Sequence, residues 1–84
     1  GHVEGSVLSP GVYVHSYSRV DDSVVMHNCR IGRHAQVQRA ILDKNVVVEP
    51  GAKIGFDHEH DRARGLSVTE SGIAVAPKGL VIPQ

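Results

Sequence analysis

The stretch Ala40–Gly55 reads AILDKNVVVEPGAKIG and carries the pattern that decides the fold. Its apolar runs are at most three residues long, whereas an ordinary strand has about five or six. The turn-forming segments Asp43–Asn45 and Glu49–Gly51 separate these runs. Because strands this short gain little from pairing singly, they indicate an architecture in which similar units stack on one another.

The same pattern occurs three times at a constant spacing. The segments SVLSPGVYV, SVVMHNCRI and AILDKNVVV superpose without gaps and begin at Ser6, Ser23 and Ala40. Apolar residues fall in shared columns, one of which contains Val3, Val20, Val37 and Ile54. Another column contains only residues that tolerate a positive φ, and these are Gly11, Asn28 and Asn45. That column predicts a tight corner in every repeat.

The spacing inside one period predicts a triangular coil. Steps of six, five and six residues lead from Val14 to Val20, Val25 and Ile31. Each step corresponds to one flat side and one corner, and stacked coils would lie about 4.8 Å apart. Hexapeptide spacing is typical of the left-handed β-helix, an exception to the right-handed crossover rule. The sequence therefore predicts an all-β fold, a left-handed parallel β-helix with 17-residue triangular coils.

The repeat is no longer evident after Gly55. The segment Phe56–Gly65 is polar and charged, which predicts a loop or a short helix. Short strand-like runs follow, and we expect them to fold back as a cap on the open end of the coils. We therefore divide the chain into β-helix coils at residues 1–55 and a C-terminal loop with capping strands at 56–84, both within one domain, which we expect to be a fragment of a larger protein.

The composition excludes several classes of function. The 84 residues contain 9 Lys and Arg against 9 Asp and Glu, so the chain lacks the basic excess of nucleic-acid or membrane-surface binders. The single cysteine, Cys29, cannot form an internal disulfide, which is typical of a reducing, cytoplasmic compartment. No apolar stretch approaches the roughly 20 residues that a membrane span requires.

Histidines and the cysteine are the candidates for chemistry. In an extended chain His58 and His60 would share a face and could meet one metal ion, but no further Cys or His lies nearby in sequence to complete the site. We interpret this segment as a solvated connection with ion pairs and predict no metal site.

Three further histidines suggest enzymes of the same shape. β-Helix acyltransferases use a histidine base, and β-helix carbonic anhydrases bind zinc through histidines. His27 and His34 fall in exposed corner columns without stacking on another histidine, so we interpret them, with His15, as surface residues. Cys29 shares an apolar column and is predicted to lie in the core. No catalytic triad order or phosphate loop is present, so we predict no catalytic residue.

Four segments resemble the C-terminal domain of the bacterial ADP-glucose pyrophosphorylase (glucose-1-phosphate adenylyltransferase) family, and these are SVLSPGVYV, AILDKNVVVEPGAKIG, DHEHDRARG and VTESGIAVAPKG. The resemblance covers nearly the whole chain. It implies a nucleotidyltransferase that makes ADP-glucose and diphosphate from ATP and glucose 1-phosphate for glycogen synthesis. It also implies Mg²⁺ in the parent enzyme, a homotetramer, an N-terminal catalytic domain on the same chain and allosteric control.

The resemblance also implies two effector-binding residues. Lys44 in LDKN matches a cation near the inhibitor-nucleotide pocket, and Lys78 in APKG matches a cation that contacts a phosphorylated activator. This chain itself would then hold no cofactor and act as a regulatory and oligomerisation domain that binds phosphorylated sugars or nucleotides. The alternatives are a hexapeptide-repeat acyltransferase trimer that binds coenzyme A, the β-helix of another sugar nucleotidyltransferase, and a scaffold without ligand.

Overall fold

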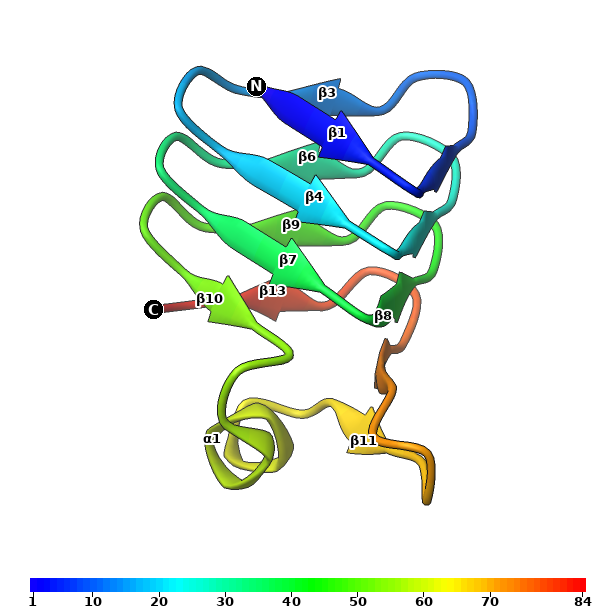
Figure 1. Ribbon diagram of the computed structural model, residues 1–84, viewed down its shortest axis with the longest axis vertical. Helices are drawn as coiled ribbons and strands as arrows, with labels where there is room; N and C mark the ends of the chain where they lie inside the picture. Colours follow the sequence, from blue (N-terminus) through cyan, green and yellow to red (C-terminus); the bar gives the residue numbers. More distant parts are fainter.

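A computed structural model describes all residues, 1–84, and shows a β-helix with three flat sides (Figure 1). The first sheet contains the parallel strands β1 (His2–Glu4), β4 (Arg19–Asp21), β7 (Gln36–Gln38) and β10 (Lys53–Ile54). The second contains β2 (Val7–Leu8), β5 (Val24–Val25), β8 (Ala40–Leu42), β12 (Ala74–Ala76) and, antiparallel at its end, β11 (Ser67–Val68). The third contains β3 (Tyr13–Val14), β6 (Arg30–Ile31), β9 (Val47–Val48) and β13 (Val81–Ile82).

The register of the strands confirms the predicted period. Val3 pairs with Val20, Val20 with Val37, and Val37 with Ile54, so each residue pairs with its equivalent in the next repeat. In Figure 1 the strands of the first sheet cross the near face from left to right, the third sheet returns behind them, and the chain descends. The coils therefore wind in the left-handed sense, as the hexapeptide spacing predicts.

Inward side chains of successive coils fill the prism. Sixteen buried apolar residues form one continuous core, and the fully buried members include Val20, Leu42, Val46 and Ile54. In the first coil the inward residues Val3 and Leu8 are partly exposed because no coil lies above them. Most of the stability therefore comes from contacts between neighbouring coils, as in other solenoids.

One corner of every coil passes through the left-handed region of φ. The values of φ are +81° at Gly11, +62° at Asn28, +60° at Asn45 and +77° at Gly79. Glycine has no Cβ to clash there, and asparagine tolerates the region better than most residues. The column that was predicted from three repeats is thus confirmed, and it has a fourth member in the tail.

The short strands after Gly65 fold back onto the prism, and they do so by completing a fourth coil. β10, β12 and β13 pair with β7, β8 and β9 of the third coil. Ile41 follows Val37 by four residues, whereas Val75 follows Ile54 by 21. The fourth coil therefore contains a 17-residue insertion between its first and second sides. That insertion hides the resumption of the repeat after Gly55.

The insertion forms the helix α1 (His58–Ala63) and the strand β11 below the prism (Figure 1). Asp57 caps the helix, since its Oδ1 accepts a hydrogen bond from the backbone N–H of His60 at 3.2 Å. No helix in the structure has the length and hydrophobicity that crossing a membrane requires.

A buried ion pair fixes the insertion to the prism. The Asp61 carboxylate accepts a hydrogen bond from the Arg64 guanidinium through Oδ1 and one from the backbone N–H of Gly55, at 3.0 Å, through Oδ2. Arg64 also donates to the backbone carbonyls of Pro83 and Lys53, each at 2.7 Å. Side-chain exposure is 0% for Asp61 and 5% for Arg64, so this network connects the helix, β10 and the C-terminus.

Candidate functional site

The two lysines suggested by the resemblance lie on adjacent coils of one corner. β12 pairs with β8 and β13 pairs with β9, which places Lys78 in register with Lys44. The N–H of each residue after the corner donates to the corner carbonyl one coil away: Asn28 to Pro10, Asn45 to His27 and Gly79 to Lys44, at 3.3, 3.0 and 2.9 Å. We call Pro10, His27, Lys44 and Lys78 the corner column.

The corner column concentrates positive charge at its C-terminal end. Both lysines are exposed, and neither forms an ion pair with a carboxylate of this chain. Adjacent coils are about 4.8 Å apart, so the roots of the two side chains are closer than a Debye length at physiological salt. Ammonium groups on side chains whose roots are this close repel each other when they approach, and a phosphate that accepts hydrogen bonds from both relieves that repulsion.

The third titratable member of the column is His27, one coil from Lys44 and also exposed. His27, His34 and the half-buried His15 do not stack on one another, and the ring of His34 stacks instead on Tyr17 with centroids 5.0 Å apart. The rings of His15 and His34 therefore pack on tyrosines and not on another histidine.

Cys29 lies in the core, as predicted. Its side chain is fully buried, and its thiol donates a hydrogen bond to the backbone carbonyl of Asp43 at 2.9 Å. Burial raises the pKa of this thiol above its ordinary value, because a thiolate would lose its hydration. Cys29 is therefore a packing residue and not a nucleophile.

The histidines of the insertion do not share a face. His58 and His60 lie in α1, where residues two apart point to roughly opposite sides of the helix. The segment Phe56–Gly65 was predicted to be a loop or a short helix, and the Asp57 cap starts a short helix there. The one ion pair of this segment is the buried pair of Asp61 and Arg64.

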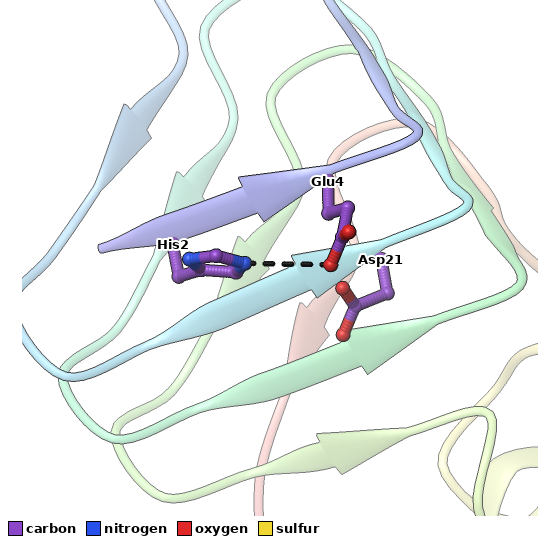
Figure 2. Close-up of side chains that lie close together, drawn as sticks. All are labelled: His2, Glu4 and Asp21. Atoms are coloured by element: carbon purple, nitrogen blue, oxygen red, sulfur yellow. Dashed lines mark ion pairs between the residues drawn. The ribbon is translucent and has the colours of Figure 1, made fainter.

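One cluster of possible metal ligands lies on the first sheet, where His2 and Glu4 project from β1 beside Asp21 from β4 (Figure 2). Their ligand atoms lie within 4.8 Å of one another. However, the Arg19 guanidinium is 2.6 Å from the Asp21 carboxylate and 3.4 Å from that of Glu4. The hydrogen bond from Arg19 to Asp21 raises the pKa of the guanidinium, so a cation must displace a permanent positive charge.

This cluster also does not fit the Mg²⁺ that the resemblance implies for the parent enzyme. Mg²⁺ prefers an octahedron of oxygen ligands, whereas the cluster offers one imidazole and two carboxylates that already bind a guanidinium. The geometry is that of an exposed network of ion pairs.

The structure defines a domain class, the left-handed β-helix built from hexapeptide-type coils with a cationic corner. The chain belongs to the family described as GlmU-like, C-terminal hexapeptide, whose family model matches residues 1–76.

Curated relatives agree with the resemblance that the motifs suggested, and they bear the name glucose-1-phosphate adenylyltransferase. The relative from Parafrankia sp. (strain EAN1pec) is 61% identical over 82 residues, which cover 98% of this chain and 20% of the relative. The relative from Arthrobacter sp. (strain FB24) is 61% identical over 84 residues, or 100% of this chain and 18% of the relative. The relative from Cutibacterium acnes is 51% identical over 78 residues. The chain thus spans about a fifth of the length of these relatives.

Proposed function

We propose that this chain is the C-terminal β-helix of a glucose-1-phosphate adenylyltransferase and that it regulates and assembles the enzyme. The observation that carries the proposal is the 61% identity to adenylyltransferases of that name across nearly the whole chain. The parent enzyme would transfer the adenylyl group of ATP to glucose 1-phosphate, releasing diphosphate. A catalytic part outside this chain would perform that reaction.

The proposed regulatory site is the end of the corner column, Lys44 and Lys78. An effector phosphate would accept hydrogen bonds from both ammonium groups, and the remainder of the effector would contact the catalytic part. Such an effector favours the arrangement of the β-helix and the catalytic part in which both contact it. If that arrangement also binds substrate differently, the binding of effector and the binding of substrate become coupled. The proposal is supported by the registration of the two lysines on adjacent coils and by their lack of carboxylate partners.

The proposed contact with the catalytic part is the outer face of the second sheet. A continuous apolar ladder crosses this face, because Val7, Val24, Ile41 and Val75 are paired in register. Val7 is 64% exposed and Val24 is 38% exposed. The outward residues of the first sheet are polar or charged by contrast, namely His2, Glu4, Arg19, Asp21, Gln36, Gln38 and Lys53.

We assign the remainder of the same polypeptide to that face. The relatives are about five times as long as this chain, and a tethered partner binds at a high effective concentration even through a small surface. In the full-length polypeptide Val24→Asp is then expected to weaken effector response while the coils stay folded. If Val24→Asp and the outward control Gln36→Asp leave effector response equally unchanged, the assignment of this face fails.

The proposal has three further parts. The catalytic part would use Mg²⁺, the enzyme would be a homo-oligomer, and it would act in the cytoplasm on the route to glycogen. Binding of acetyl coenzyme A to the purified protein, measured by isothermal titration, would instead favour the acyltransferase alternative.

The test uses the full-length polypeptide and measures diphosphate release from ATP and glucose 1-phosphate, with and without phosphorylated sugars and nucleotides. We expect activity, and we expect Lys78→Ala and Lys44→Ala to raise the effector concentration for half-maximal response about tenfold while the basal rate is kept. Lys53→Ala is the matched control, since Lys53 is an exposed lysine of β10 outside the corner column. An intact protein without diphosphate release contradicts the assigned activity, and an unchanged response in both corner variants contradicts the assigned site.

A further inference from the structure

We propose a second ligand site on the third sheet, where Arg30 and Arg33 bind the phosphate of a small phosphorylated polyol and Glu49 binds its hydroxyl groups. The site is a shallow depression of about 280 Å³ between the second and third coils. Its lining includes His15, Val47 and Pro50 as well. It is separate from the corner column and does not depend on the function proposed for Lys44 and Lys78.

One glycine lies at the floor of the depression. His15, Gly32 and Glu49 occupy equivalent positions in successive coils, directly after β3, β6 and β9. Gly32 is buried, and a Cβ at that position would lie 2.6 Å from the backbone N of Pro50 and 2.7 Å from the carbonyl O of Val48. The close approach of the third coil therefore requires glycine. Because Gly32 has no side chain, only backbone lies between His15 and Glu49 at the floor of the depression.

Two free guanidinium groups border this depression. Arg30 projects outward from β6, Arg33 lies at the following corner, and neither forms an ion pair. Arg33 is held over the Tyr17 ring, with Cζ 5.2 Å from the ring centroid, which restricts the directions its donors can take. Three other arginines are already engaged: Arg19 with Asp21, Arg39 with the Ser71 carbonyl, and Arg64 with Asp61.

The donor set indicates the class of ligand. A guanidinium presents a rigid fork of N–H donors that matches the oxygens of a phosphate, and two such forks balance a dianion. Glu49 is exposed and repels a bare phosphate, but its carboxylate accepts hydrogen bonds from neutral hydroxyls. Val47 and Pro50 supply an apolar surface for the carbon skeleton. A phosphate ester that carries hydroxyl groups satisfies all of these residues, whereas inorganic phosphate satisfies only the arginines.

The location distinguishes this site from the corner column. Lys44 precedes β9 (Val47–Val48) and Glu49 directly follows it, so these two residues lie at opposite ends of one side of the prism. An extended chain rises about 3.3 Å per residue, and the separation is therefore on the order of 10 Å. A single small phosphate ester does not fill both sites at once.

The experiment is chemical footprinting of the full-length polypeptide with phenylglyoxal, which modifies arginine side chains. Modification rates at Arg30, Arg33 and Arg62 are read from peptides by mass spectrometry, with ribose 5-phosphate, inorganic phosphate or sodium chloride at equal ionic strength. Arg62 is the internal control, because it is exposed on α1 and forms no ion pair. We expect ribose 5-phosphate to slow modification of Arg30 and Arg33 together, without protection of Arg62.

Variants sharpen the assignment. Arg30→Gln should raise the ribose 5-phosphate concentration for half-protection of Arg33 about tenfold, as expected for loss of a charged hydrogen bond. Glu49→Gln should have opposite effects on the two probes: protection by ribose 5-phosphate weakens, and protection by inorganic phosphate strengthens. Lys44→Gln/Lys78→Gln should leave both protections unchanged.

The inference is overturned if chloride protects as well as ribose 5-phosphate, if only one of the two arginines is protected, or if Glu49→Gln shifts both probes in the same direction. Loss of protection in Lys44→Gln/Lys78→Gln would indicate that the ligand binds at the corner column. That result would also overturn the inference. Failure of the corner variants to change effector response, with protection of Arg30 and Arg33 intact, contradicts the proposed function alone.

Discussion

Replacing Asp61 by asparagine tests whether the buried ion pair holds the insertion to the β-helix. The change preserves the size of the side chain and one of its oxygens. It replaces the other oxygen with an NH₂ donor, which must face either the Gly55 N–H or the Arg64 guanidinium. One acceptor is therefore lost, and the charge of Arg64 remains buried without a counterion.

The structure gives the magnitude. Removal of one partner from a buried ion pair costs about 3–5 kcal/mol of unfolding free energy. Arg64 still donates to the carbonyls of Pro83 and Lys53 in the variant, so we expect the lower end, about 3 kcal/mol. A domain of this length has a total stability on the order of 4–13 kcal/mol. The substitution should therefore remove a large fraction of the stability.

The assay is urea unfolding followed by circular dichroism, with Asp21→Asn as the matched control. Asp21 also pairs with an arginine, at 2.6 Å, but the side chains of Arg19 and Asp21 are 53% and 25% exposed. An exposed pair contributes about 0–1 kcal/mol. If Asp61→Asn lowers the unfolding free energy no more than Asp21→Asn does, burial is not what makes the Asp61 pair important, and the reasoning is refuted.

Two glycines and the cysteine give further predictions. Gly55→Ala should lower the unfolding free energy in urea by at least about 3 kcal/mol, because φ is +89° and a Cβ would lie 1.9 Å from the Gln38 carbonyl O. Gly79→Ala should lower it by only about 1 kcal/mol, because φ is +77° but no atom lies within 4 Å of the added Cβ. Equal losses in the two variants would contradict the steric argument. Native Cys29 should react with a thiol reagent only at the rate of unfolding, and fast reaction of the folded chain would contradict its burial. Since its folded pKa is raised, its contribution to stability should be complete below the ordinary value of 9.0 and should decline as the pH rises above it, a decline that Cys29→Ala should lack.

The coils were predictable because their constraints recur within one period. Each inward side chain faces its equivalent one coil away, so Val20, Val37 and Ile54 report the same packing environment three times. The corner with positive φ admits only a few residue types, which makes Asn28 and Asn45 informative at the level of sequence. Cys29 was assigned to the core for the same reason.

The insertion was not predictable in this way, because its contacts are not periodic. Asp61 lies in a charged segment that resembles a solvated connection, and its burial depends on Arg64, Gly55 and the distant Pro83 carbonyl. The resumption of the coil was accessible by a different comparison. A shift of two periods places Ala74–Pro83 on Ala40–Glu49 and would have placed Lys78 beside Lys44.

The insertion also has a consequence for how such a chain can change over evolutionary time. Lys44 and Lys78 are far apart in sequence, but their spacing is set by hydrogen bonds on either side of the corner. Exposed residues of the insertion can change without altering that spacing, provided that the buried pair of Asp61 and Arg64 is kept and the chain re-enters the ladder at Ala74. The exposed sequence of the insertion and the spacing of the two lysines can therefore change independently. A lineage can alter the insertion while the distance between Lys44 and Lys78 stays constant.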